Sequence, residues 1–195
     1  MKLKKITNIL VGHPFRGKIP EVTDSNIMVI QMRNISVETG VDWATCIKTE
    51  ISSKWGFKQL KQGDILFVAR GENNIAVIID NIPQGKLIVA APQFFIIRVI
   101  KEEILPEFLA WLINQKPIQQ YFQQRKEGSM TKSIRRQVIE ETPIIIPLLQ
   151  KQQMIIKLSS ILQKEKNILK QLISNGEITM NAIANDLFAS NNPNK

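Results

Sequence analysis

The sequence of 195 residues contains only one cysteine and one histidine, Cys46 and His13. Together they cannot form an internal disulfide or supply the ligands of a structural zinc site. The chain also lacks the run of about 18 apolar residues that a membrane span requires. Its opening, MKLKKITNILVGHPF, has too short a hydrophobic stretch for an export signal. We therefore expect a globular cytoplasmic protein without membrane association.

Motifs of the common DNA-modifying enzymes are absent as well. No acidic residue is followed two positions later by lysine, as the commonest restriction-nuclease site requires, and no Pro-Pro dipeptide is present for the Asn/Asp-Pro-Pro-aromatic motif of amino-methyltransferases. The GxxxxGK[ST] and GxGxxG motifs are missing too. A single histidine disfavours a hydrolytic triad. We expect no catalytic residue, metal or cofactor, and keep an enzyme with an unrecognised site as an alternative.

Positive charge is in excess, with a net charge of +9. Such an excess suits a polyanionic partner such as nucleic acid, although many solvated surfaces are basic without one. The densest cluster is QQRKEGSMTKSIRRQ, residues 123–137, in which five basic residues oppose one acid. Gly128 and Ser129 provide a turn, and the hydroxyl of Ser129 can bind phosphate. The competing interpretation is a solvated loop whose Arg125 and Lys126 complement the end of a helix.

A second candidate is RGENN, residues 70–74, at the end of the apolar segment DILFVAR. Arginine can donate two hydrogen bonds to guanine, and asparagine can pair with adenine, but the same residues also suit an ordinary hairpin tip. The segments HPFRGK and QMRN are weaker basic patches. The residues that we predict to contact DNA are Arg16, Lys18, Arg33, Arg70, Asn73, Asn74, Lys126, Ser129, Lys132, Arg135 and Arg136.

The pattern as far as Pro147 predicts an α+β fold that is mostly antiparallel β with packed helices. Helical spacing runs from Leu105 to Gln124, with a break at Pro117. The segment LKKITNIL near the start is too short to assign. Short β-branched and aromatic runs, separated by turn residues, predict strands within 27–35, 64–70, 75–80, 86–91 and 94–100.

After Pro147 the apolar spacing becomes that of a long coiled-coil-like helix, residues 148–173. Glu165 falls on its apolar seam, which disfavours a long parallel zipper but allows a packed pair of helices. We expect Ser174-Asn175-Gly176 to end the helix, and residues 174–195 to form a short helix and a disordered tail. The residues predicted to mediate dimerisation are Ile155, Leu158, Leu162, Leu169 and Leu172.

The order of these segments resembles the specificity subunit of type I restriction-modification systems. The resemblance covers about residues 2–173, and each piece is weak alone. It rests on Leu60-x-x-Gly63-Asp64-Ile65-Leu66, Arg70-Gly71, Ala91-Pro92-Gln93-Phe94-Phe95-Ile96-Ile97-Arg98, Leu105-x-x-Phe108-Leu109-x-x-Leu112, Gly128-Ser129, Pro143-Ile-Ile-Ile-Pro147-Leu148 and Gln153-x-Ile155-Ile156.

The resemblance implies a non-catalytic target recognition domain, residues 1–147, that binds double-stranded DNA with its basic tip, 126–136. Residues 144–148 would form a closing strand that leads into a spacer helix, 148–173, which docks methyltransferase subunits and, where the system restricts DNA, a restriction subunit. Gly63-Asp64, Gln93 and Gly128-Ser129 would chiefly determine the fold.

Two departures from the family bear on this prediction. Leu148-Leu149 stands where members usually carry Pro-Pro, and the chain has one recognition domain and one helix instead of two. It therefore resembles a half-length subunit. Two copies paired through the helix, over about 36 Å, would recognise an inverted repeat. The alternatives are a split subunit with a different second half and a protein-interaction adaptor whose basic surface is incidental.

Overall fold

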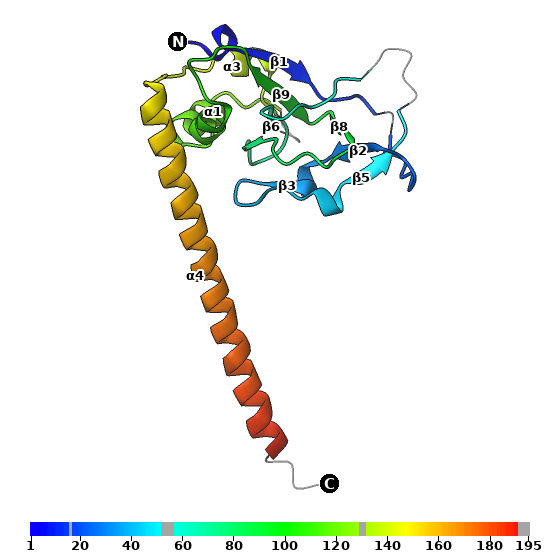
Figure 1. Ribbon diagram of the computed structural model, residues 1–195, viewed down its shortest axis with the longest axis vertical. Coiled ribbons are helices and arrows are strands. Elements are labelled where there is room, and N and C mark those ends of the chain that lie inside the picture. The colour runs from blue at the N-terminus through cyan, green and yellow to red at the C-terminus, as the bar shows by residue number, and fades with distance from the viewer. Residues whose placement is uncertain (16, 52–56, 129–131, 191–195) are drawn as a thin grey trace. The chain divides into compact units, whose positions relative to one another are not determined.

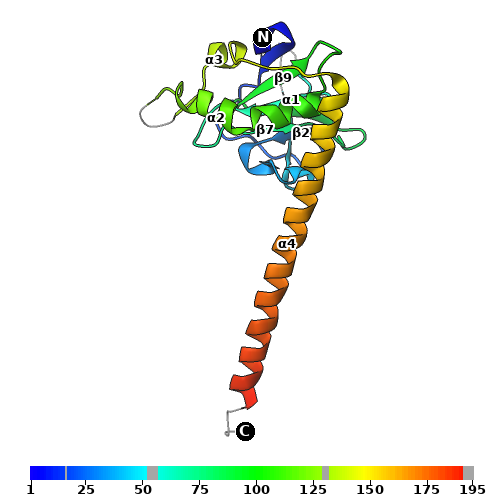
Figure 2. The ribbon, with the colours of Figure 1, turned by 90° about the vertical axis from the view of Figure 1, so that its left-hand side faces the viewer.

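The computed structural model describes residues 1–15, 17–51, 57–128 and 132–190. The chain divides into two compact units, Met1–Ile156 and Lys157–Lys195. The first unit contains every strand found among the described residues, together with three short α-helices, and the second consists of the greater part of one long helix (Figures 1 and 2). The predicted α+β class is confirmed.

Two sheets form the frame of the first unit. The larger is antiparallel throughout, with the strand order β1 (Thr7–Val11), β9 (Phe94–Val99), β6 (Ile65–Val68), β7 (Ala76–Ile78). The smaller has the order β5 (Ile47–Thr49), β2 (Ile27–Ile30), β8 (Leu87–Ala90), in which β2 and β8 run parallel. A short ladder joins β3 (Ile35–Ser36) to β4 (Gly40–Val41).

Helical segments connect and cover these strands. Three are 3-10 turns, namely η1 (Leu3–Lys5), η2 (Met32–Asn34) and η3 (Trp43–Thr45). The α-helices are α1 (Pro106–Ile113), α2 (Lys116–Gln123), α3 (Arg136–Glu140) and α4 (Leu149–Ser190). The predicted break at Pro117 is confirmed, because α1 ends at Ile113 and Pro117 lies in the first turn of α2.

Each of the five predicted strand segments contains a strand, although the first is cut short by η2. The strand β1, by contrast, lies within the unassigned segment LKKITNIL and just beyond it. It pairs with β9, so that Thr7 lies opposite Val99 and Val11 opposite Phe95. Because this partner is remote in the sequence, the local pattern gives little sign of the strand.

Alternation along the central strands divides the apolar core into two clusters. Ile65 and Phe67 of β6 point to a cluster that includes the buried faces of α1 and α2. Leu66 and Val68 point the other way, into a cluster shared with β2 and β8. Since successive side chains of a strand face opposite sides, β6 is buried on both faces.

An ion pair with a buried carboxylate stabilises the first unit. Arg98 donates to Asp64 from Nε to Oδ1 and from Nη2 to Oδ2, each over 2.7 Å, and the Asp64 side chain is 2% exposed. The backbone N–H of Lys61 also donates to Asp64 Oδ2 over 2.8 Å. These contacts agree with the role in the fold that we predicted for Gly63-Asp64. Gly63 has a φ of +85°, which favours glycine.

The predicted closing strand at 144–148 is wrong. Only an isolated bridge joins Pro143 to Lys2, and the backbones of Met1 and Ile144 exchange two hydrogen bonds of 2.8 and 2.7 Å. The two prolines that flank this segment have no N–H to donate, which prevents a regular ladder.

The first turns of α4 belong to the first unit. Gln152 is buried, where its Oε1 accepts from the Leu105 N–H over 2.9 Å and its Nε2 donates to the carbonyls of Glu103 and Pro147 over 2.8 Å. Ile155 and Ile156 pack partly buried against the core. Ile155, which we predicted on the dimerisation seam, therefore has part of its surface covered within the single chain, and its role in pairing stays a prediction.

The predicted end of the helix at 174–176 is also wrong, because α4 continues to Ser190. Gly176 is not among the glycines with positive φ, so it does not form a left-handed cap. The 42 residues of α4 have a contour of about 63 Å, which replaces the estimate of about 36 Å. The predicted disordered tail, 191–195, lies outside the described residues.

Candidate nucleic-acid interface

The strand register places several loops at one edge of the first unit. Val68 lies opposite Phe94, Val11 opposite Phe95, and Ile30 opposite Ala90, so β1, β2, β6 and β8 all end near the start of β9. Three loops leave the sheets at this edge, and a fourth segment contacts them. We call the described residues of these four segments the loop edge. They belong to 12–18, 31–34, 69–74 and 126–134, without residues 16 and 129–131.

Glycine is required where the first of these loops leaves the sheet. A Cβ on Gly12 would lie 2.0 Å from the carbonyl oxygen of Ala91 and 2.9 Å from that of Ala90, which is sterically impossible without a shift of the backbone. The Gly12 N–H donates to the Phe94 carbonyl over 3.0 Å, and the His13 N–H donates to the Ala90 carbonyl over 2.7 Å. The segment that carries Lys18 therefore starts against both sheets.

The two strongest sequence candidates, 70–74 and 126–134, lie side by side. The Gly71 N–H donates to the Lys132 carbonyl over 2.9 Å, and the Ile134 N–H donates to the Ala69 carbonyl over 2.8 Å. Arg70 and Ser133 form an isolated bridge. Lys126 adds a side-chain contact from Nζ to the carbonyl oxygen of Glu72 over 2.5 Å. The structure thus joins, through the backbone, two basic segments that the sequence separates widely.

A third loop adjoins this pair. Met32 of η2 places its Cε 3.8 Å from the position that a Cβ would take on Gly71. The buried Asn34 holds this loop, because its Oδ1 accepts from the Gln31 N–H over 2.7 Å and its Nδ2 donates to the Thr45 carbonyl over 3.0 Å. Arg33, between Met32 and Asn34, is exposed beside the other basic loops.

The predicted contact residues differ in how free their side chains are. Lys18, Arg33, Arg70, Asn73 and Lys132 are exposed, and the four cations among them make no ion pair within the described part of the chain. Arg16 and Ser129 lie outside the described residues.

Three other predicted residues have partners that restrict them. Asn74 is 1% exposed and donates from Nδ2 to the Val68 carbonyl over 2.9 Å, so it closes the loop and cannot reach a base in this conformation. Lys126 is half-buried, and burial lowers the pKa of its ammonium group. Arg135 pairs with Glu127. We assign these side chains chiefly to holding the loop edge together.

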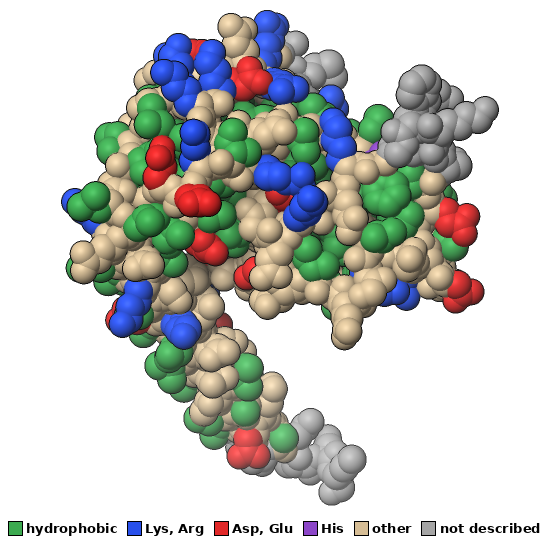
Figure 3. Space-filling model, turned by 45° about the horizontal axis from the view of Figure 1, so that its top comes forward, with side chains coloured by type: hydrophobic (Ala, Val, Ile, Leu, Met, Phe, Trp, Pro, Cys, Tyr) green, Lys and Arg blue, Asp and Glu red, His purple; other side chains and the backbone are tan. Residues whose placement is uncertain are grey.

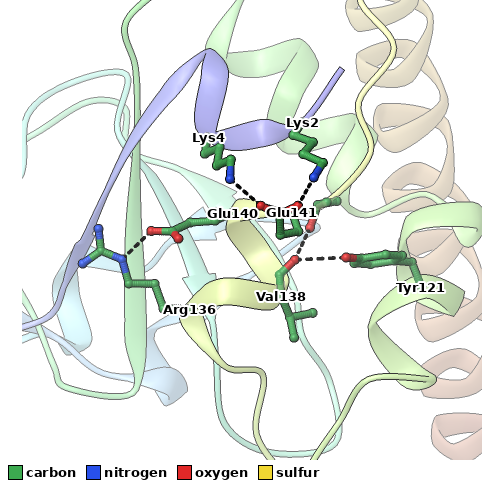
Figure 4. A network of polar contacts seen from close by, with 8 residues as sticks. Lys2, Lys4, Tyr121, Arg136, Val138, Glu140 and Glu141 are labelled. Carbon is green, nitrogen blue, oxygen red and sulfur yellow. Dashed lines mark hydrogen bonds and ion pairs between the residues drawn. The ribbon is translucent and has the colours of Figure 1, made fainter.

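Arg136 belongs to a different polar network, on α3 (Figure 4). Its Nε donates to Glu140 Oε1 over 2.7 Å, while Lys2 and Lys4 both bind the Glu141 carboxylate. Hydrogen bonds from the two lysines lower the pKa of Glu141. Because the Arg136 charge already faces an acid, we expect it to contribute less to binding than the unpaired cations.

Lys and Arg side chains gather along the upper margin of the surface in Figure 3, with acidic side chains among them. Not every cation of the basic cluster is available there. The guanidinium of Arg125 lies 4.0 Å from the centre of the Tyr121 ring and donates to the Tyr121 carbonyl over 3.3 Å. This geometry fits the competing interpretation of Arg125 as a residue of the helix end.

We looked for metal-ligand clusters and membrane-spanning helices in the described ranges. They contain no group of three or more His, Cys, Asp or Glu side chains arranged to hold a metal ion. No helix in them combines the length and the apolar composition that crossing a membrane would need.

Some residues that shape the interface were not predicted. Gly12, Met32, Asn34 and Gln152 hold loops or the start of α4 in place. Gly12 had a local signal, since Gly-His-Pro follows an apolar run and indicates a turn. The other three act through contacts between distant segments, for which the sequence gives no comparable signal.

A cationic edge of several loops on an α+β domain is a surface whose charge suits an extended polyanion. The family comparison is more specific. The chain belongs to the family described as the type I restriction modification DNA specificity domain, whose model matches residues 3–178. The specificity subunits of these systems are non-catalytic DNA-recognition proteins.

Solved structures from type I systems share the fold of this chain. The S subunit of a type I restriction-modification system from M. genitalium has 15% identity and a TM-score of 0.57, and the match covers 98% of this chain and 46% of that one. The HsdS subunit from Thermoanaerobacter tengcongensis has 16% identity and a TM-score of 0.63, with 100% and 50% covered.

A third similar chain comes from a structure that describes complex assembly and conformational transition of the type I R-M system. It has 15% identity and a TM-score of 0.72, and the match covers 100% of this chain and 50% of that one. The chain thus spans about half the length of the solved proteins that it matches. No curated protein sequence matches it.

Proposed function

We propose that the chain is a half-length specificity subunit that recognises double-stranded DNA through the loop edge. Arg33, Arg70 and Lys132 would bind phosphates or bases, and Asn73 and Lys18 would extend the contact. Arg16 and Ser129 remain predicted contacts. No step of this function needs a cofactor.

The convergence of basic segments that are remote in the sequence is the observation that supports this proposal most strongly. Segments 70–74 and 126–134 are joined by backbone hydrogen bonds, and the loop of Arg33 lies against them. A cation that neutralises one phosphate contributes about −0.9 to the slope of log affinity against log salt. Cations gathered at one edge can therefore act together on one duplex.

Substitution of two unpaired cations tests the proposal. Arg70→Gln and Lys132→Gln should each weaken binding to duplex DNA and reduce the salt slope by about one. Lys101→Gln is the matched control, because Lys101 is also exposed but follows β9, at the opposite end of this strand from the loop edge. Fluorescence anisotropy from 50 to 200 mM salt measures all three. Equal loss in the control and the two variants would contradict the proposal.

Recognition of a bipartite site is the second part of the proposed function. Two copies paired through α4 would present two identical loop edges related by a two-fold axis, which select an inverted repeat with a spacer between its halves. Light scattering at micromolar concentration tests the pairing. Mixing with a candidate second half distinguishes self-pairing from a split subunit, in which chains would exchange.

Docking of methyltransferase subunits, and of a restriction subunit where one exists, follows from the family and is likewise proposed. Co-purification with a methyltransferase subunit of the same system is its direct test. An adaptor with an incidental basic surface would instead bind its partner unchanged through high salt and would enrich no duplex from a random pool.

A further inference from the structure

An apolar stripe runs along one side of α4. Each residue of a helix turns by about 100°, and the stripe residues fall within about 60° of one direction. They are 48–66% exposed, which is unusual for large apolar side chains unless another surface covers them. The stripe consists of Met154, Leu158, Ile161, Leu162, Leu169, Leu172, Ile173, Met180, Ile183 and Leu187.

Two residues on the same side of the helix interrupt the stripe. Glu165 places a carboxylate there, and Gly176 places no side chain at all. Glycine in a helix interior costs about 1 kcal/mol relative to alanine. A Cβ on Gly176 would meet no atom within 4 Å, so nothing in the single chain requires glycine at this position. Both Glu165 and Gly176 would be explained if they faced each other across an interface.

We infer that α4 pairs with α4 of a second copy in one antiparallel register, whose two-fold axis passes between Lys170 and Gln171. This register brings the two interruptions together, with Glu165 opposite Gly176 of the second copy. The space left by the missing side chain lets Glu165 extend to the rim and keep its carboxylate in water. Apolar side chains face each other in four further layers, and they are Met154 with Leu187, Leu158 with Ile183, Ile161 with Met180, and Leu169 with Leu172.

Charge on the flanks of the stripe fits the same register. Lys166 and Glu177 lie on the same flank, and the antiparallel arrangement brings each within about two positions of the other on the second copy. Lys166 of each copy therefore lies near Glu177 of the other copy, which gives one pair of opposite charges on each side of the two-fold axis. The copies overlap from Met154 to Leu187, which is about 50 Å along the helix.

Competing registers lose these matches. In a parallel pair, Glu165 would face Glu165 and Gly176 would face Gly176, which gives like-charge repulsion in one layer and a void in another. Sliding the antiparallel pair by one heptad puts Glu165 opposite Leu169 or Ile183, where its carboxylate would be buried against an aliphatic side chain. The two interruptions thus act as determinants of register.

Disulfide formation between introduced cysteines tests the register. The double variant Leu158→Cys/Ile183→Cys should migrate as a covalent dimer under mild oxidation. Leu162→Cys/Leu172→Cys reports one slipped register, Ile161→Cys/Leu187→Cys reports the other, and Leu158→Cys alone reports the parallel pair. The unmodified chain is the background, because Cys46 is buried and its thiol pKa is raised to about 11.

The inference rests on the proposed pairing of two copies, and two measurements separate their failures. A monomer in light scattering, with no covalent dimer from any variant, overturns both. A dimer that is cross-linked by a slipped variant instead of Leu158→Cys/Ile183→Cys, or by Leu158→Cys alone, overturns the register alone. A negative result in the DNA-binding experiment leaves the register as it is.

Discussion

The two units of the chain differ in how far their large apolar side chains are exposed. In Met1–Ile156, large apolar side chains fill two buried clusters on either side of the central strands. In Lys157–Lys195, comparable side chains at helical spacing remain about half exposed. The first unit therefore buries its apolar side chains within the single chain, whereas the second leaves an apolar surface that a partner could cover. The same contrast separates residues that stabilise the fold from residues available for binding.

The largest effect should come from breaking the partly buried ion pair of the first unit. Asp64→Ala leaves Arg98 without its bidentate partner and the Lys61 N–H without its acceptor, and each lost hydrogen bond to a charged group costs about 1.5–3 kcal/mol. Urea unfolding followed by tryptophan fluorescence at fixed protein concentration measures the loss. The control is Arg136→Ala, which removes an exposed pair worth about 0.3–0.5 kcal/mol. Similar losses of unfolding free energy in both variants would show that burial of the ion pair does not determine its contribution to stability.

A charge in the stripe of α4 should disrupt pairing and leave the first unit folded. Leu169→Asp removes an apolar side chain worth about 1.5–3 kcal/mol per copy when buried. Sedimentation should show a shift from dimer to monomer, with an unchanged near-ultraviolet spectrum from the aromatic core. The matched control is Lys170→Asp, one position away but off the stripe. Loss of the core spectrum in Leu169→Asp would contradict the independence of the two units.

Removal of Glu165 should affect both the strength and the register of α4 pairing. Glu165→Leu completes the stripe, so we expect tighter pairing but a mixture of registers, as when a polar residue is removed from a coiled-coil seam. In the cysteine experiment, the slipped variants should then also form covalent dimers. Continued selection of a single register would show that Glu165 does not determine it.

A smaller effect is expected from Lys126→Met. The variant removes the contact with the Glu72 carbonyl that helps to join segments 70–74 and 126–134, at a cost of about 1 kcal/mol. Because Lys126 holds the two segments together, DNA affinity should fall in this variant, whereas the slope of log affinity against log salt should change little. Lys132→Gln is the comparison, since it should change both. Identical salt behaviour of the two variants would assign Lys126 to phosphate contact instead.

The smallest effect concerns acid stability. Hydrogen bonds from Lys2 and Lys4 lower the pKa of Glu141, so its stabilising contribution is present above the ordinary glutamate pKa and is lost as pH falls through the lowered value. The unfolding temperature should therefore fall more steeply between pH 7 and pH 3 in the natural chain than in Glu141→Gln. Parallel curves would show that this exposed carboxylate has no measurable effect.

The sequence predicts elements whose signals are local. The strands that contain Phe67 and Ile97, the break at Pro117 and the apolar spacing of α4 all follow from patterns over a few residues. The strand β1 and the role of Gln152 depend on partners far along the chain, and their prediction fails for that reason. The continuation of α4 through Gly176 was missed because Ser-Asn-Gly satisfies the local rule for a helix end.

The candidate site follows the same division. Residue type and charge single out the segments around Arg70 and Lys132, but only tertiary structure shows that the two are joined. Burial of Asn74 and the ion pairs of Arg135 and Arg136 could not be foreseen, because each depends on backbone positions that the sequence does not specify. A charged residue in a basic loop therefore needs its partner identified before it is assigned to binding.

We propose that the loop edge recognises DNA and that two copies of the chain present it together. Selection of bound duplexes from a fully randomised library tests both parts in one experiment. We predict enrichment of a two-part inverted repeat with an unspecified spacer, which Arg70→Gln and Lys132→Gln weaken. No enrichment, or enrichment of a single undivided site by the dimer, would contradict the account.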